Sequence, residues 1–221
     1  MKSASGRERM RFYGYFRSSA AYRCRIAFNL KGVAPEFAPI HLRRGDQRAP
    51  DFLALNPQGL VPALDIGGRV LTQSLAIIEW LDETRPEPPL LPRDPLERAE
   101  VRAFALAIAA DIHPLNNLRV LKYLKEPLGH DQAAIDDWYR HWVEVGLKAC
   151  EQLVLKDGRH GPYCFGAMPT LADVCLLPQL ANARRVNSDL SACPTLLEIE
   201  ACCAQHAAFA AAAPDKQPDA E

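Results

Sequence analysis

A proline-rich break at residues 84–89 divides the sequence into two parts with different hydrophobic patterns. The segment Thr84-Arg85-Pro86-Glu87-Pro88-Pro89 holds three prolines, which lack an amide hydrogen and therefore end a helix. Before the break, short apolar runs typical of strands alternate with helical runs. After it, nearly every apolar pattern has the helical period. A chain of 221 residues suits one large domain or two small ones, each with a core of its own.

The first part predicts a small mixed sheet covered by helices, because its elements follow the order β-α-β and then β-β-α. Gly67-Gly68 predicts a two-residue hairpin turn between the last two strands. Ser74 is expected to cap the helix that follows. We expect strands over residues 11–16, 36–40, 61–66 and 69–72, and helices over about 19–31 and 74–83.

The second part is predicted to be entirely helical. Thr170 and Asp173 have the spacing of a capping box at a helix start, and their expected role is structural. The tail from Ala210 is expected to lie loose on the surface. We expect helices over about 95–124, 131–155, 171–187 and 195–209. The expected organisation is a flexible extension over 1–9, a first domain over 10–89, a linker over 90–96, a helical domain over 97–213 and a tail over 214–221.

Charge and hydropathy argue against several classes of partner. The 26 basic and 27 acidic side chains give a net charge of -1, so no strong basic field attracts nucleic acid or an anionic membrane. The longest apolar runs, such as Phe104 to Ala110, fall far short of the roughly 20 residues that a membrane span needs. Residues 1–10 lack the apolar core of a secretory signal.

The seven cysteines predict a reducing environment. Their number is odd and no CxxC pair occurs, which argues against a disulfide framework and a zinc ribbon. Scattered cysteines on apolar faces are typical of small core residues in a reducing compartment. We therefore expect a cytoplasmic protein without a metal site.

Three short motifs have the chemistry of a peptide-thiol site. Ser18 and Ser19 lie where a strand gives way to a helix, and a helix N-terminus with a hydroxyl donor can lower the pKa of a bound thiol. Val61-Pro62 precedes a strand, where a cis peptide would expose the valine backbone for pairing. Gln73-Ser74 opens a helix whose amides would hold a carboxylate. Taken alone, each serine motif can be an ordinary helix cap, and Val61-Pro62 can be a loop with a trans proline. The order of the three motifs along the chain is more specific than any one of them.

The sequence resembles the zeta class of glutathione transferases, which includes maleylacetoacetate isomerase and bacterial maleylpyruvate isomerase. The match covers about Arg11 to Asp219. It is carried by Arg17-Ser18-Ser19, Arg23-Cys24-Arg25-Ile26-Ala27, Leu30-Lys31-Gly32, Ala54-Leu55-Asn56-Pro57, Val61-Pro62-Ala63-Leu64, Gln73-Ser74-Leu75-Ala76-Ile77-Ile78-Glu79, Leu90-Leu91-Pro92-Arg93-Asp94, Asp111-Ile112-His113-Pro114-Leu115-Asn116-Asn117, Pro178-Gln179 and Lys216-Gln217-Pro218-Asp219.

The resemblance implies a glutathione transferase fold: an α/β thioredoxin-like N-terminal domain, an all-α C-terminal domain and assembly as a homodimer. It also implies that glutathione is the cofactor. Ser18 would hydrogen-bond the glutathione thiolate, with Ser19 beside it. Val61, followed by Pro62, would pair its backbone with the cysteinyl part of glutathione. The γ-glutamyl carboxylate would be held by Gln73 and Ser74, and the rest of the tripeptide would lie near Gln47, His113 and Asn117.

Ala20 departs from the class pattern, in which a cysteine follows the two serines. No protein thiol is therefore expected at this site, and the nucleophilic sulfur would be that of glutathione. The bacterial maleylpyruvate branch also lacks this cysteine. Ala20, His113 and Arg119 together favour that branch.

The implied reaction is a cis–trans isomerisation of maleylacetoacetate or maleylpyruvate in the breakdown of aromatic compounds, by thiolate addition, rotation and elimination. The substrate is a small dicarboxylate keto acid, and arginines suit it because their planar guanidinium pairs with carboxylates. Arg17, Arg185 and Arg119 are the candidates for substrate binding, and Arg17 is also grouped with the catalytic serines. Arg23 and Arg25 are assigned to helix packing or to the subunit interface.

Two other functions remain open at this point. A general glutathione transferase or peroxidase would use the same thiolate on electrophiles or hydroperoxides. A non-catalytic glutathione-binding module is the third possibility, against which the intact set of Ser18, Val61, Gln73 and Ser74 argues.

Overall fold

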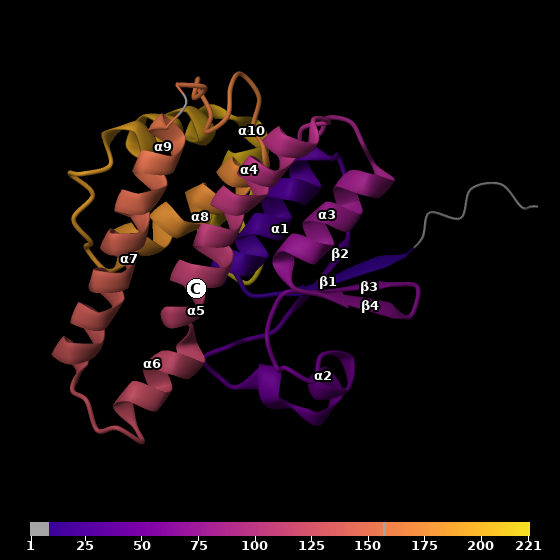
Figure 1. Ribbon diagram of the computed structural model, residues 1–221. Helices are drawn as coiled ribbons and strands as arrows, with labels where there is room; N and C mark the ends of the chain where they lie inside the picture. Colours follow the sequence, from indigo (N-terminus) through magenta and orange to yellow (C-terminus); the bar gives the residue numbers. More distant parts are fainter. Residues whose placement is uncertain (1–8, 157) are drawn as a thin grey trace, which may run out of the picture. The chain divides into compact units, whose positions relative to one another are not determined.

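The computed structural model describes residues 9–156 and 158–221, which belong to two compact units. One unit consists of the chain up to Pro88 together with Ala211–Glu221, and the other is Pro89–Ala210 (Figure 1). The extension expected over residues 1–9 lies, apart from Arg9, outside the described residues. A mixed sheet with helices in the first unit and a helical second unit agree with the patterns in the sequence.

A four-stranded sheet of order β2-β1-β3-β4 forms the centre of the first unit. β1 runs parallel to β2 and antiparallel to β3, which pairs antiparallel with β4. Gly67 and Gly68 have φ angles of 60° and 95°, so glycine suits both positions of the predicted turn. The strands are β1 Met10–Gly14, β2 Glu36–Pro39, β3 Ala63–Ile66 and β4 Arg69–Thr72.

Neighbouring residues of β1 pack on opposite faces of the sheet, as the strand pleat requires. The ring of Phe12 lies 5.0 Å from that of Phe28 in α1, and the ring of Tyr13 lies 6.0 Å from that of Phe52 in α2. The helices of this unit are α1 Ser19–Leu30, α2 Pro50–Leu55 and α3 Ser74–Thr84, with a short 3-10 turn, η1, over Asp46–Arg48. α2 is absent from the elements predicted above, because six residues are too few for a clear hydrophobic period.

The first strand is shorter than predicted, because Tyr15 and Phe16 belong to the turn that starts α1. The Tyr15 carbonyl accepts the Ser18 amide at 2.9 Å, and this bond closes the turn. The predicted strand over residues 11–16 is therefore wrong at its end, although the aromatic residues there are buried as expected.

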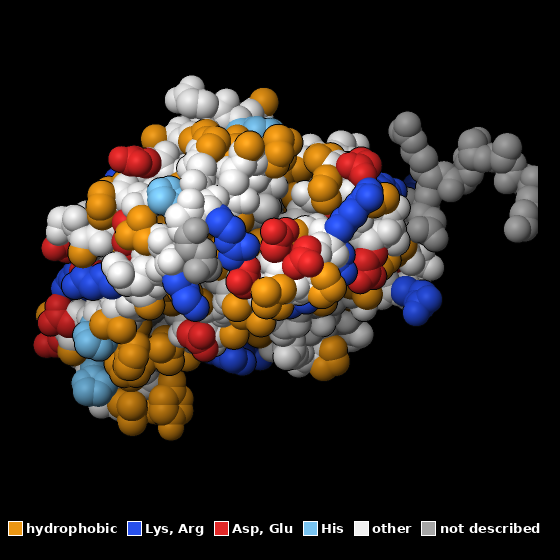
Figure 2. Space-filling view, turned by 45° about the horizontal axis from the view of Figure 1, so that its top comes forward, with side chains coloured by type: hydrophobic (Ala, Val, Ile, Leu, Met, Phe, Trp, Pro, Cys, Tyr) orange, Lys and Arg blue, Asp and Glu red, His pale blue; other side chains and the backbone are white. Residues whose placement is uncertain are grey.

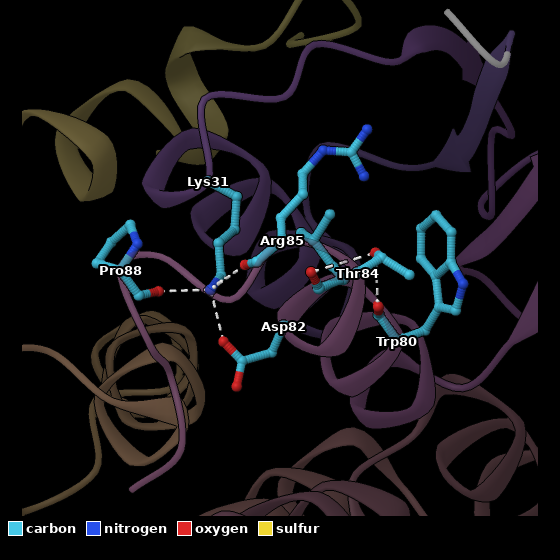
Figure 3. A network of polar contacts seen from close by, with 7 residues as sticks. Lys31, Trp80, Asp82, Thr84, Arg85 and Pro88 are labelled. Atoms are coloured by element: carbon cyan, nitrogen blue, oxygen red, sulfur yellow. Dashed lines mark hydrogen bonds and ion pairs between the residues drawn. The ribbon is translucent and has the colours of Figure 1, made fainter. Parts of the chain in front are cut away.

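Lys31 holds the proline-rich break against the end of α3 (Figure 3). Its buried Nζ donates to Asp82 Oδ1 at 2.5 Å, to the Arg85 carbonyl at 2.7 Å and to the Pro88 carbonyl. Three acceptors satisfy the three donors of the ammonium group. Lys31 therefore fixes the path of the chain between α3 and Pro88.

The C-terminal tail does not lie loose, so that prediction is wrong. Its residues Ala211–Glu221 are hydrogen-bonded to the first unit at several points. The Ala212 carbonyl accepts Arg25 Nε at 3.0 Å, for example. The alanine and proline composition indicated a flexible segment, but the tail contains specific polar side chains that pair with the first unit.

The second unit consists of helices around the central helix α8. Thr170 and Asp173 form the predicted capping box, in which the Thr170 amide donates to Asp173 Oδ2 at 2.7 Å. The buried Glu151 of α7 accepts the amides of Thr195 and Leu196 at the start of α9. The helices are α4 Pro95–Leu106, the π-helix η2 Ala107–Ile112, α5 His113–Leu115, α6 Leu118–Lys125, α7 Gln132–Leu155, α8 Leu171–Arg185, α9 Pro194–Gln205 and α10 Ala207–Ala211.

The single helix predicted over residues 95–124 is wrong, because the chain changes its winding three times there. The α-helix widens into η2 after Leu106, and Pro114 then lacks the amide hydrogen that a continuous helix would use. A turn at Asn116 follows, and Asn117 starts α6 by accepting the Arg119 amide on Oδ1 at 3.1 Å. The predicted helix over 195–209 is likewise divided, at His206.

Candidate active site

Ser18 is the N-cap residue of α1. Its hydroxyl oxygen accepts the Ala21 amide at 3.2 Å, as the local sequence predicts. Because the oxygen is the acceptor in this cap, the hydroxyl hydrogen remains able to donate to a ligand at the helix N-terminus. Ser19, the first residue of the helix, is buried beside it.

Arg25 of α1 stabilises the turn before Ser18 through two hydrogen bonds. Arg25 Nη2 donates to the Phe16 carbonyl at 3.1 Å, and Nη1 donates to the Tyr15 carbonyl at 3.4 Å. Burial lowers the pKa of Arg25 to about 10, so its guanidinium is still charged at neutral pH. The exposed Arg17 lies with its guanidinium 5.6 Å from the Phe16 ring. Sequence reasoning assigned Arg25 to packing or to a subunit interface and missed its contacts with this turn.

The Val61-Pro62 peptide is cis, the conformation that the sequence analysis considered for it. The loop before it is fixed by Asn56, whose Nδ2 donates to the Leu60 carbonyl at 2.7 Å. A Cβ on Gly59, which has a φ of 61°, would lie 2.9 Å from the Gln47 carbonyl oxygen. The loop therefore lies directly against Gln47, whose buried Oε1 has no hydrogen-bond partner among the described residues.

Ser74 is the first residue of α3 and not its cap, which corrects the prediction. The N-cap residue is Gln73, which has a φ of 69° and makes no side-chain cap bond. Gln73 Nε2 donates instead to Gln58 Oε1 at 3.0 Å, and this bond joins the start of α3 to the loop before the cis peptide.

Arg23 is the buried neighbour of Ser74. The residue is 1% exposed, and its Nη1 donates to Ser74 Oγ at 3.3 Å. Its Nε and Nη2 are buried without a hydrogen-bond partner among the described residues. Arg23 was predicted to serve packing or an interface, and no local pattern indicated that its guanidinium reaches Ser74 at the start of α3.

The starts of α1 and α3 both favour an anion. The first turn of each helix contains no acidic residue, so no carboxylate of the helix itself offsets the partial positive charge of the free amides. Ser18 adds a hydroxyl at the first start, and Ser74 with Arg23 adds a hydroxyl and a cation at the second. This arrangement fits a ligand with a thiolate and a carboxylate.

The second unit carries His113, Asn117, Arg119 and Arg185. His113 begins α5, and Asn117 is the cap of α6, so its Oδ1 is already an acceptor for the Arg119 amide. The Arg119 side chain is exposed on the first turn of α6. The structure therefore gives Asn117 a capping role in addition to any contact with a ligand.

Arg185 lies at the end of α8 and is supported by Tyr139 of α7. Arg185 Nη2 donates to the Tyr139 hydroxyl at 3.0 Å, and the guanidinium carbon lies 5.9 Å from the ring centre. Burial raises the pKa of Tyr139, and Arg185 partly opposes this effect. The contact orients the guanidinium while much of it stays exposed.

The described part of the chain gives no indication of a metal centre or a membrane span. It contains no group of three or more His, Cys, Asp or Glu side chains placed to hold a metal ion. None of its helices is both long and apolar enough to cross a membrane. Figure 2 shows acidic and basic side chains interspersed over the visible face, in keeping with the net charge of -1.

Comparison with known proteins gives matches over nearly the whole chain. Residues 17–84 match the family described as "Glutathione S-transferase, N-terminal domain". The chain is 48% identical to the maleylpyruvate isomerase of a Ralstonia species over 210 residues, which are 95% of this chain and 99% of that protein.

Two solved structures agree with this match. A "holo structure of maleyl pyruvate isomerase, a bacterial glutathione-S-transferase in Zeta class" has a TM-score of 0.93 and 47% identity, over 96% of this chain and 100% of that one. A maleylacetoacetate isomerase from Methylobacterium extorquens AM1 "with bound malonate and GSH" has a TM-score of 0.92 and 42% identity, over 96% and 99%. The predicted fold, an α/β thioredoxin-like part followed by an all-α part, is confirmed.

Proposed function

Because the chain belongs to the zeta class of glutathione transferases, the family of the maleylpyruvate and maleylacetoacetate isomerases, we propose that it is a glutathione-dependent cis–trans isomerase. The substrate is a small dicarboxylate keto acid, maleylpyruvate or maleylacetoacetate. The observation that carries the proposal is the arrangement in the first unit: two helix starts without acidic residues, each with a serine, beside a cis Val61-Pro62 peptide.

When bound, glutathione supplies a thiolate for reversible addition to the substrate double bond, which permits rotation before elimination. The residues around Ser18 keep the sulfur in its charged form. The Ser18 hydroxyl hydrogen is free to donate to it, since the hydroxyl oxygen already accepts the Ala21 amide. The N-terminus of α1 adds partial positive charge, which lowers the pKa of a thiol held there. Arg17, next to Ser18, brings a cation to the same turn.

The other residues of the first unit hold the tripeptide. Ser74 and the free amides of α3 bind the γ-glutamyl carboxylate, and Gln73 supports them. The Val61 backbone, directly before Pro62, pairs with the cysteinyl part of glutathione. Gln47 lies against the same loop through Gly59. The resemblance also assigns His113 and Asn117, which belong to the second unit, to the tripeptide.

Arginines are the residues assigned to the substrate carboxylates, Arg17 in the first unit and Arg119 and Arg185 in the second. Arg17, Arg119 and Arg185 are exposed and carry permanent charge, and none of the three has a salt-bridge partner among the described residues. Arg185 is further oriented by Tyr139. Malonate, the dicarboxylate bound with GSH in the relative from Methylobacterium extorquens AM1, supports a site for a small dicarboxylate.

A direct assay tests the proposal. Purified protein with glutathione is expected to convert maleylpyruvate or maleylacetoacetate into its fumaryl isomer, followed by absorbance, with no net loss of glutathione. The same preparation is offered a standard aryl electrophile and a hydroperoxide. Turnover of the electrophile or hydroperoxide without isomerisation would show a general transferase or peroxidase instead.

We propose further that the protein is a cytoplasmic homodimer. All seven cysteines lie in the described part of the chain and none forms a disulfide, which fits a reducing compartment. Sedimentation of the purified protein is expected to give twice the chain mass of 24.5 kDa. A single sedimenting species with the mass of one chain would contradict the dimer.

A further inference from the structure

The C-terminal tail, residues Ala211–Glu221, contacts the turn that carries Arg17 and Ser18 through Asp219. We propose that Asp219 is a positioning residue for this turn, so that the tail completes the glutathione thiolate site. The inference rests on the proposed function, because it assigns a role in the same reaction.

The contact is a single hydrogen bond from backbone to carboxylate. Asp219 Oδ2 accepts the Phe16 amide at 2.9 Å, across 203 residues of sequence. The other carboxylate oxygen, Oδ1, is buried without a hydrogen-bond partner among the described residues. The Phe16 amide is thus the hydrogen-bond donor that binds the Asp219 carboxylate. A hydrogen bond to a charged acceptor is stronger than one between neutral groups.

Asp219 completes the set of groups that hold this turn. Arg25 binds the carbonyls of Tyr15 and Phe16 through Nη1 and Nη2, and its Nε binds the Ala212 carbonyl of the tail. The two peptide groups before Arg17 are therefore held by Arg25 on their carbonyl side and by Asp219 on the Phe16 amide. Arg25 also contacts the tail directly, so the turn and the tail share one support.

Phe16 connects these hydrogen bonds to Arg17 and Ser18. Its buried ring lies under the Arg17 guanidinium, and the neighbouring Tyr15 carbonyl accepts the Ser18 amide. A shift of Phe16 would move the Ser18 hydroxyl relative to the start of α1. Small displacements of a positioned group are enough to reduce a reaction rate strongly.

A second contact of the tail joins Glu221 to the loop that leads to Gln47. Glu221 Oε1 lies 2.6 Å from His41 Nε2, and His41 donates its amide to Asp46 Oδ2 at 3.1 Å. The rings of His41 and Tyr15 are 5.1 Å apart. The tail therefore joins the Ser18 turn to the loop of a second expected glutathione contact.

Three variants test the role of Asp219. Asp219→Ala removes the acceptor, whereas Asp219→Asn keeps an oxygen acceptor without the charge. Asp215→Ala is the matched control, since Asp215 is an exposed tail residue whose Oδ2 lies 3.6 Å from Lys216 Nζ. Each variant is measured for the thiol pKa of bound glutathione by thiolate absorbance, for isomerisation kinetics, for thermal unfolding and for exchange of the Phe16 amide hydrogen by NMR.

We expect Asp219→Ala to lower kcat about tenfold, to raise the thiol pKa of bound glutathione and to accelerate Phe16 amide exchange about tenfold, as the loss of one charge-assisted hydrogen bond implies. Asp219→Asn should give a smaller change in the same direction, and Asp215→Ala none. A folded Asp219→Ala protein with the kcat and thiol pKa of an active wild type would overturn the inference alone. A wild type that neither binds glutathione nor isomerises would instead overturn the proposed function, while the exchange measurement still reports on the contact.

Discussion

The guanidinium of Arg23 lies inside the first unit and donates through Nη1 to the hydroxyl oxygen of Ser74 at 3.3 Å. Burial of a charged group is costly unless its donors are paired, yet Nε and Nη2 have no partner among the described residues. An anion bound at the start of α3 would offset part of this cost. Because Ser74 Oγ accepts from Arg23, its hydrogen is directed to another acceptor, which in our proposal is the γ-glutamyl carboxylate.

Replacement Arg23→Met is therefore expected to separate stability from binding. The melting temperature should stay the same or rise, since an apolar side chain of similar length removes an unpaired buried charge. The Kd for glutathione in calorimetry should rise about tenfold, for the loss of about 1.4 kcal/mol from the oriented hydroxyl and the nearby charge. Arg11→Met, at an exposed pair with Glu36, is the control and should change neither quantity. A lower melting temperature with unchanged Kd would show that Arg23 is a packing residue.

Replacement Ser18→Ala is expected to reduce the isomerisation rate far more than the stability. Loss of the cap should lower the free energy of unfolding by about 1 kcal/mol. Loss of the donor to a thiolate should reduce kcat by about a hundredfold or more, by analogy with other donors to a developing anion. Asp131→Ala is the matched control, because Asp131 caps α7 through the Ala134 amide at 2.9 Å. Equal loss of activity in both variants would reduce the role of Ser18 to capping.

Gly146→Ala is expected to destabilise the second unit, although alanine is the better helix former. A Cβ at Gly146 would lie 2.3 Å from Ile112 Cγ1, so α7 can approach η2 only without a side chain there. The helix propensity of alanine would add about 1 kcal/mol, but overpacking of this contact should cost about 1–3 kcal/mol or more. Denaturant unfolding measures the balance. Ala149→Gly, at an exposed position of the same helix, is the control that measures the effect of helix propensity alone. A Gly146→Ala protein more stable than the wild type would contradict the close approach of α7 to η2.

The buried thiols are expected to make the fold sensitive to alkali. Burial raises the pKa of Cys150 to about 12 and that of Cys164 well above its ordinary value. The folded chain thus keeps protons that the unfolded chain loses above about pH 8.5, so stability falls as the pH rises, by about 1.4 kcal/mol per unit for each such thiol. The Cys150 contribution extends to about pH 12. The free energy of unfolding, measured from pH 8 to 10, should decline less steeply in Cys150→Ala than in the wild type. An identical slope in the two proteins would show that the Cys150 thiol does not cause the decline.

The parts of the fold that were predictable are those fixed by local chemistry. Gly67-Gly68 indicated a hairpin because only glycine adopts positive φ at both positions without strain, and Thr170 with Asp173 indicated a helix start by side chains three residues apart. The helix over 95–124 was predicted as continuous because its apolar period persists, whereas the change of winding at η2 leaves no mark on composition.

The helix cap within the candidate site was predictable in a similar way. Ser18 could be identified as a cap from the sequence, because the strand ends just before it and the helix begins just after it. The roles of Arg23 and Asp219 could not, because each depends on a contact between segments that lie far apart in the chain. No periodic pattern records such a contact, and the tail in particular has the composition of a loose segment.

The anchoring of the tail also sets the order in which the protein can mature. The sheet of the first unit is translated before the helices of the second unit, whereas Asp219 and Glu221 follow those helices in the sequence. A nascent chain can therefore form the sheet early, but it gains the Phe16 and His41 contacts only once the tail has been synthesised. A stop codon placed directly before Asp219 would keep the helices and strands of both units and remove the carboxylate that accepts the Phe16 amide.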